Sequence, residues 1–252
     1  MSRLGRIGSE VTAARKAFLR RRTAVFFTFF FPLLIVVIFG ALVQTQAGSG
    51  GLFTEPPAFY VPGYLAVVVL FTPLSRVGSE VARHRDGNRF EKLATTPLSR
   101  PEWLVGQSLV NVAVIGLAGL LVLALMVVLT GATIVLTPVS VALMVLFVAV
   151  GVALFCGFGA LIGSFAGSQD GVIAASNGIA LPLLFLSETF VPTAMLPGWL
   201  PTGLSPLTYF SRGVRAVATG ESTGVAVENL AVLAVVGVAF FFAGAMALPR
   251  TD

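Results

Sequence analysis

Six long apolar stretches alternate with polar or charged segments along the chain. They cover residues 23–43, 58–74, 103–129, 138–162, 172–187 and 229–248. A membrane-crossing helix needs about 20 mostly apolar residues, and the third and fourth stretches reach that length without a charge. The second stretch is short for a membrane span and contains Pro62 and Gly63. We therefore allow for a helix that continues beyond Leu74. We therefore predict an all-α polytopic membrane protein with six transmembrane helices, forming a single domain over residues 1–252.

The segment before the first apolar stretch is also patterned. Leu4, Ile7, Val11, Ala14 and Phe18 recur every three or four residues, which places them on one side of a helix. An apolar stripe flanked by basic residues is typical of a helix that lies in the membrane interface, so we predict such a helix over 1–22. A solvated basic tail is the alternative. A cleaved signal peptide is disfavoured, because the apolar run that follows is about 20 residues long instead of the usual 7–15.

The segment 188–228 cannot form one long helix because prolines interrupt it repeatedly. These are Pro192, Pro197, Pro201 and Pro206. Between the last proline and the sixth apolar stretch, an apolar face is formed by Leu207, Phe210, Val214 and Val217. We predict one or two short re-entrant helices in the outer leaflet, with Trp199 and Tyr209 as interfacial anchors.

Charge is scarce and unevenly distributed. Charged residues make up 11% of the chain, against roughly 25% in soluble domains, and the formal net charge is +5. Seven basic residues lie in 1–22, six in 75–102 and one in the C-terminal tail, whereas 188–228 has only Arg212 and Arg215. Basic loops stay on the cytoplasmic side, so both termini and the 75–102 loop are predicted to be cytoplasmic. This asymmetry explains the basic pI without a nucleic-acid partner.

Residues that support catalysis or nucleotide binding are few. The only lysines, Lys16 and Lys92, are not preceded by glycine, so the chain has no phosphate-binding loop of the Gly-Lys-Ser/Thr type. His84 is the only histidine, and no cluster of His, Cys and carboxylates suits a metal. The predicted spans contain almost no paired ionisable groups, which disfavours an intramembrane enzyme or an ion-coupled carrier.

Two ordered motifs resemble segments of a known family. The first lies within 79–100 and consists of a charged segment with Gly87, followed by Phe90-Glu91, Thr96-Pro97 and Arg100. The second consists of Phe185-Leu186-Ser187-Glu188-Thr189-Phe190-Val191-Pro192, then Leu196-Pro197-Gly198-Trp199-Leu200, then Ser205-Pro206-Leu207-Thr208-Tyr209-Phe210 and Arg215. Together they resemble the type-2 permeases of ABC transporters, in the daunorubicin-resistance-type branch. At Asn88-Arg89 the first motif differs from many members of the family. The position of the coupling contact along this loop is therefore defined only to about one residue.

The resemblance implies a permease subunit in a prokaryotic cell membrane that exports a hydrophobic drug or lipid-like substrate. Its partners would be two cytoplasmic ABC ATPases and a second permease, identical or related, within membrane lipids. The ATPases would use ATP and Mg²⁺, and this chain would bind no cofactor. Alternatives are export of a lipid-linked polysaccharide and a non-transporting membrane scaffold.

The resemblance also assigns candidate site residues. The 79–100 loop would form a short coupling helix against the ATPase; the alternative is a solvated cytoplasmic loop. Its candidate coupling residues are Glu80, Arg83, Arg85, Asp86, Arg89, Glu91, Pro97 and Arg100. The polar candidates for the substrate path are Ser176, Asn177, Ser187 and Glu188.

Overall fold

The computed structural model describes residues 2–38, 55–191 and 195–249, and these residues form helices joined by short connections with no strand among them. The helices are α1 (Arg3–Arg20), α2 (Arg22–Val36), α3 (Val61–Asp86), α4 (Arg89–Ala94), α5 (Arg100–Thr130), α6 (Pro138–Phe165), α7 (Gln169–Phe185), α8 (Pro206–Thr219) and α9 (Thr223–Ala247). Short 3₁₀ turns, η2 (Pro57–Tyr60) and η4 (Thr202–Leu204), precede α3 and α8. The predicted all-α class is confirmed.

Four of the described helices are long and apolar enough to cross a membrane. They are Pro57–Asp86, Arg100–Thr130, Pro138–Phe165 and Thr223–Ala247. This confirms a multi-pass membrane protein. The apolar α2 has 15 residues, and the rest of the predicted first span, 39–43, lies outside the described residues. With 17 residues, α7 is also below the length of a full span, so six crossings stay a prediction.

Two helices extend past the bounds of the predicted apolar stretches. The second stretch was predicted over 58–74 with a helix able to continue beyond Leu74, and α3 does continue, to Asp86, into the predicted 79–100 loop. It continues because Val77, Val81 and Ala82 keep one face buried against the neighbouring helices while the polar residues between them find partners. The sixth stretch was expected to begin at 229, but α9 begins at Thr223, where the Ser222 side chain accepts a hydrogen bond from the Gly224 backbone N–H.

Helix α6 packs closely against both α3 and α9 because it carries glycines where their backbones approach. A Cβ on Gly159 would collide with the Leu74 carbonyl oxygen of α3, and one on Gly163 with the Gly78 carbonyl oxygen. On the other side, a Cβ on Gly157 would lie 2.5 Å from Phe241 Cα of α9. These small residues therefore serve packing within one chain.

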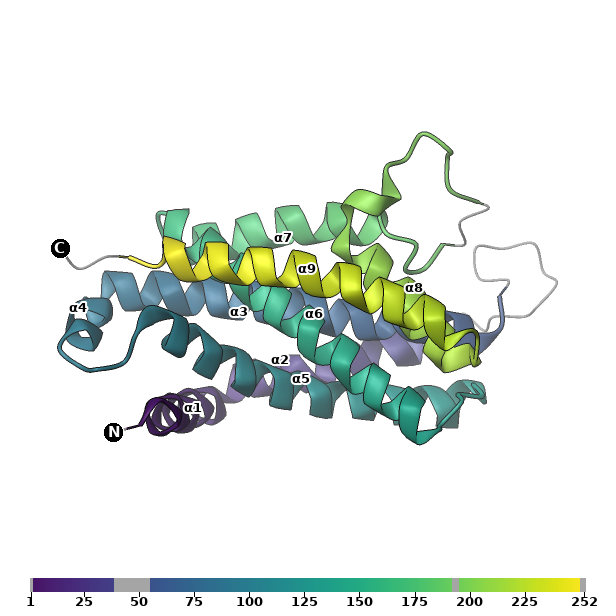
Figure 1. Cartoon of the computed structure of the whole chain (residues 1–252), viewed down its shortest axis with the longest axis horizontal. Helices are drawn as coiled ribbons and strands as arrows, with labels where there is room; N and C mark the ends of the chain where they lie inside the picture. The colour runs from purple at the N-terminus through teal and green to yellow at the C-terminus, as the bar shows by residue number, and fades with distance from the viewer. Residues whose placement is uncertain (1, 39–54, 192–194, 250–252) are drawn as a thin grey trace.

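The two ends of the bundle differ in charge. Figure 1 shows α1, α4 and the end of α9 at one end of the bundle and α8 at the other. The first end, here called the basic end, carries α1, α4, the start of α5 and the end of α9. At the other end, here called the opposite end, the basic residues of α8 are Arg212 and Arg215. The structure thus separates the charges as the sequence predicts.

The predicted N-terminal helix forms and lies across the bundle, since Figure 1 shows α1 nearly end-on beside long helices that run across the page. Only part of the predicted apolar stripe of this helix is exposed, as a surface that faces lipid would be. Phe18 is buried, Ile7 and Val11 are half-buried, and Leu4 is 82% exposed. The stripe packs largely on α5, where Gly106 leaves room for Glu10 and Val11.

The predicted short helix between the fifth and sixth stretches also forms, as α8. Its expected apolar face is buried, with Leu207, Phe210 and Val214 at most 1% exposed. Phe147 of α6 packs edge-on against Phe210. Trp199 is exposed, whereas the Tyr209 hydroxyl donates to the Gly203 carbonyl at 3.1 Å.

Candidate coupling site

The connection between α3 and α5 contains the helix predicted for coupling. Gly87 ends α3, and Asn88 takes the left-handed conformation, with φ +51°, that starts α4. Asparagine is among the few residues that tolerate this conformation. Pro97 lies in a bend after α4, and Ser99 caps α5. A short helix therefore forms in this segment and ends three residues before Pro97, and its role in coupling stays a prediction.

One aromatic side chain anchors α4 to the two long helices. Phe90 is 7% exposed and lies between His84 of α3 and Trp103 of α5. The three ring centroids are 5.4–5.5 Å apart, in tilted and edge-on arrangements. Because aromatic pairs of this geometry favour a defined orientation, α4 is fixed relative to both helices.

The predicted coupling residues divide into two groups. Asp86, Arg89 and Glu91 are exposed, together with Lys92, and form what we call the α4 tip. Pro97 is exposed beside it. The structure does not place the remaining candidates, Glu80, Arg83, Arg85 and Arg100, on this surface; all four have partners inside the protein.

Glu80 is the centre of a buried ion-pair network. Its carboxylate accepts hydrogen bonds from Arg21 at 3.0 Å and from Arg83 at 2.9 Å, and it is only 7% exposed. Arg21 lies between α1 and α2, so this network ties the N-terminal helices to α3. A carboxylate enclosed in this way holds elements together and is not available to a partner protein.

Two arginines donate hydrogen bonds to carbonyl groups at the C-terminal ends of other helices. Arg85 donates to the Ala166 carbonyl at 2.6 Å, just after α6, and Arg100 donates to the Leu248 carbonyl at 3.2 Å, just after α9. Helix C-termini leave carbonyl groups without partners, and a nearby cation satisfies them favourably. These contacts link the α4 connection to the ends of α6 and α9.

Glu102 joins α1 to the start of α5, and the sequence analysis missed it. Its carboxylate accepts the Ser99 backbone N–H at 2.9 Å, which completes a capping box, and Arg6 Nη2 at 2.6 Å. Arg3 donates to the same carboxylate at 3.2 Å. The Ser-x-x-Glu spacing predicts the cap from sequence. The arginine contacts join residues 96 and 99 positions apart and have no local signal.

A second pair extends this contact along α1. Gln107 of α5 donates to the Glu10 carboxylate at 2.9 Å. Burial raises the pKa of the Glu10 carboxyl above its ordinary value, and the Gln107 hydrogen bond partly opposes that shift. Together, the two acidic residues align α1 with the first two turns of α5.

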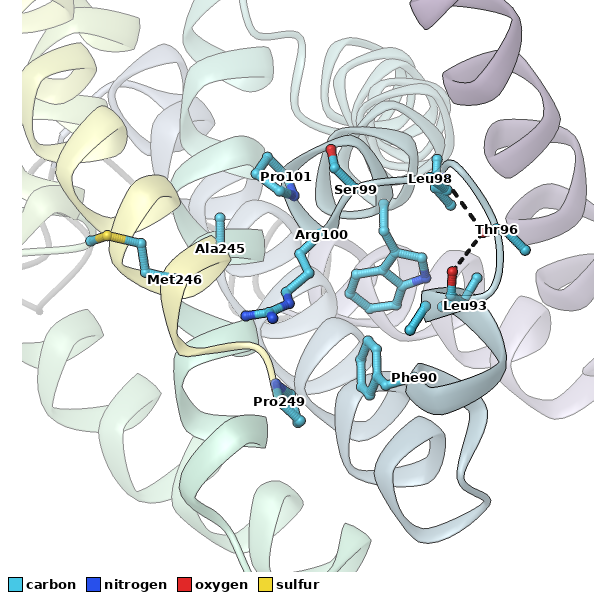
Figure 2. Close-up of a pocket in the computed structure, with 12 residues that line it drawn as sticks. Phe90, Leu93, Thr96, Leu98, Ser99, Arg100, Pro101, Ala245, Met246 and Pro249 are labelled. Atoms are coloured by element: carbon cyan, nitrogen blue, oxygen red, sulfur yellow. Dashed lines mark hydrogen bonds between the residues drawn. The ribbon is translucent and has the colours of Figure 1, made fainter. Parts of the chain in front are cut away.

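A cavity of about 490 Å³, here called the entrance cavity, lies behind the α4 tip. Phe90, Leu93 and Leu98 line its α4 side, and Ala245 and Met246 line its α9 side. Figure 2 shows Arg100 extending from the start of α5 toward Pro249, across the space between these walls.

The predicted substrate-path residues do not converge within one chain. On α7, Ser176 is buried and Asn177 is exposed, so they face different directions. Ser187 and Glu188 lie beyond the end of α7, about 16 Å from Ser176 at the rise of an α-helix. The Ser187 hydroxyl donates to the Leu184 carbonyl at 2.6 Å, so this side chain satisfies a carbonyl in the last turn of α7.

Glu188 belongs to a polar cluster at the opposite end. Arg212 Nε donates to its carboxylate at 2.7 Å, with a second, shorter bond from Nη2, and Thr202 donates at 3.2 Å. Hydrogen bonding to the Glu188 carboxylate raises the pKa of Arg212 above its ordinary value. Arg215 donates to the Glu188 backbone carbonyl at 2.8 Å and stacks on the Phe59 ring, 3.8 Å from its centroid. The cluster joins η2, the end of α7 and α8.

We expect Arg212→Ala to destabilise the protein more than Glu188→Ala. The Glu188 side chain is 4% exposed, so losing Arg212 leaves a buried carboxylate, at a cost of about 3 kcal/mol. The Arg212 side chain is 44% exposed, so water can solvate it when Glu188 is removed. Thermal unfolding of the two variants in detergent tests this order. Equal or reversed losses would contradict it.

Comparison with protein families gives a match over most of the chain. The model described as ABC-2 type transporter matches residues 9–218, which is well over half of the chain and runs from within α1 through most of α8. Comparison with curated proteins returns no match. The matched region contains most of the N-terminal helix, the α4 connection and the opposite-end cluster described above. The chain therefore belongs to the ABC-2 type transporter family, whose members are the transmembrane components of ABC transporters and act with ABC ATPase subunits.

Proposed function

We propose that this chain is the permease subunit of an exporter in the daunorubicin-resistance-type branch, which moves a hydrophobic drug or lipid-like substrate out of the cytoplasm or inner leaflet. The basic end faces the cytoplasm in this proposal, in line with the positive-inside rule. The outer-segment motifs from Phe185 to Arg215 support the branch assignment.

The observation that carries the coupling proposal is the α4 tip. It presents Arg89, Glu91 and Lys92 of α4, beside Asp86 at the end of α3, to solvent, while Phe90 and the half-buried Leu93 pack α4 on the bundle. Charged residues of both signs on a rigid support suit a polar groove on a partner protein, because such complementarity gives specificity. In this proposal the tip contacts the ATPase.

A displacement of α4 by a partner would be transmitted to several elements. The ring contacts of Phe90 connect α4 to α3 and α5, and the hydrogen bond from Arg100 connects the start of α5 to the end of α9. Glu102 then connects the start of α5 to α1. Because packed interfaces shift between discrete arrangements and do not deform smoothly, such a unit would move as a rigid body.

A second permease copy, identical or related, would complete the substrate path. The exposed apolar side chains of α7, Ile173, Leu181 and Phe185, support this arrangement. Asn177 lies on the same helix and is also exposed. Ser176 and Glu188 are enclosed within one chain, so the path proposal now rests mainly on Asn177 among the polar candidates.

We expect Glu91→Lys to abolish co-purification with the ATPase and transport while membrane insertion stays normal. The substitution reverses one charge on the α4 tip without touching the Phe90 anchor. The matched control is Glu221→Lys, an equal reversal at an exposed carboxylate at the opposite end. Pull-down of the ATPase with tagged permease measures the outcome.

The substrate class has its own test, stimulation of ATP hydrolysis by lipophilic compounds in liposomes that contain the permease and its ATPase. We expect stimulation that disappears in the Glu91→Lys variant. Normal ATPase binding by Glu91→Lys would contradict the coupling role of the tip. Failure of every lipophilic compound with intact ATPase binding would contradict the substrate assignment alone.

A further inference from the structure

Two cavities follow one another along the seam between α5 and α9. The entrance cavity lies at the basic end. A second cavity of about 410 Å³, here called the lateral cavity, lies farther along the same two helices and is lined almost entirely by apolar atoms. Its α5 wall includes Val105, Leu109 and Val112, and its α9 wall includes Ala234 and Phe241.

The two cavities share one face of each helix. On α9, Ala234, Val238 and Phe241 line the lateral cavity, and Ala245, four residues on, lines the entrance cavity. On α5, Pro101 lines the entrance cavity and Val105 lines the lateral one. Residues three or four apart stack on one side of a helix, so the cavities lie in one continuous line.

The length of this line fits a lipid tail. Arg100 and Val112 are separated by about 18 Å at the rise of an α-helix, and Ala234 and Met246 by about the same distance. The floor of the lateral cavity is formed by the small residues Ala149 and Ala153 of α6. Two cavities aligned over this length are long enough for one extended acyl chain that lies along the seam.

The charged side chain of this line, Arg100, lies at one end, while Ser108 is the one polar side chain among the residues that line the lateral cavity. Arg100 uses one nitrogen on the Leu248 carbonyl, at 3.2 Å, and is half-buried in the wall of the entrance cavity. Trp103 lines the same cavity, is 2% exposed, and its indole Nε1 has no hydrogen-bond partner. A buried N–H without a partner is costly, and a ligand with an acceptor oxygen would satisfy it.

We propose that the α5–α9 seam binds one anionic phospholipid from the leaflet at the basic end. Its acyl chain fills the lateral cavity, and its phosphate lies in the entrance cavity near Arg100 and the Trp103 indole N–H. Basic pockets between transmembrane helices on the cytoplasmic side suit anionic headgroups. A protein side chain from the ATPase could reach the entrance cavity, but it would leave the apolar lateral cavity unfilled.

Native mass spectrometry of the full-length permease, released from nanodiscs of mixed phosphatidylglycerol and phosphatidylcholine, tests the site. We expect the wild type to retain one phosphatidylglycerol per chain. Ala153→Phe fills the lateral cavity from its floor and should abolish retention. Arg100→Gln should reduce the preference for phosphatidylglycerol over phosphatidylcholine by about five-fold.

Ala113→Phe is the matched control, because Ala113 is exposed on α5 and lies outside both cavities. It should retain the lipid. Ala234→Leu narrows the lateral cavity from α9 and replaces Ala153→Phe if that variant fails to fold. Equal lipid loss in the control, or unchanged retention in both cavity variants, would overturn the proposal. So would an Arg100→Gln variant that keeps its lipid preference but loses the ATPase, since the entrance cavity would then belong to the ATPase.

Discussion

Gly157→Leu should yield no stably folded permease. Gly157 sits where α6 meets the backbone of α9, and a Cβ there would lie 2.5 Å from Phe241 Cα and 2.6 Å from the Phe240 carbonyl oxygen. Backbone atoms cannot rotate away as a side chain can, so the two helices must separate. Gly244 of α9 contacts the same turn of α6, which removes room for a compensating slide.

The expected cost is about 3 kcal/mol or more, at the upper end for overpacked cores, and is large against the marginal stability of a typical domain. Size-exclusion chromatography of a fluorescent fusion should show aggregate in place of a monodisperse peak. Gly116→Leu is the control, because a Cβ on Gly116 would meet nothing within 4 Å. A monodisperse Gly157→Leu variant with unchanged melting temperature would refute the close α6–α9 approach.

The fold could be predicted from sequence wherever composition decides it. The apolar stretches mark α3, α5, α6 and α9, and the three-four spacing of Ile7, Val11 and Phe18 marks α1. The end of α3 could not be predicted in this way. Glu80 and Arg83 indicate a loop by composition, but in the folded chain Glu80 pairs with both Arg83 and Arg21, which allows the helix to continue.

The candidate site shows the same limit. The exposed charges of the α4 tip and the break at Pro97 follow from local sequence. The roles of Arg85 and Arg100 do not, because their partners are backbone carbonyls at the ends of α6 and α9. Charge alone cannot tell an arginine that meets a partner protein from one that closes a neighbouring helix. Only tertiary packing makes that distinction.

Glu102→Ala should release α1 from α5. Glu102 has two separate roles, since its carboxylate caps α5 through the Ser99 N–H and also holds Arg6 and Arg3. Alanine removes both roles. Glutamine keeps the cap, because the capping box accepts Gln in place of Glu, but removes the negative charge. We therefore expect Glu102→Ala to lower the melting temperature more than Glu102→Gln does.

Trypsin digestion of the folded permease measures the release of α1 directly, because cleavage requires local opening of the helix. Cleavage after Arg15 or Lys16 should be about ten-fold faster in Glu102→Ala than in wild type. Arg6→Ala should be cleaved at least as fast as Glu102→Gln, because it removes the same ion pair and also leaves the 4% exposed Glu102 carboxylate without its closest cation. Arg3→Ala should have almost no effect, because the Arg3 side chain is 80% exposed and exposed ion pairs contribute little. If all four variants digest at the wild-type rate, α1 is held by its apolar face alone, and the connection between α1 and the α4 unit cannot depend on Glu102.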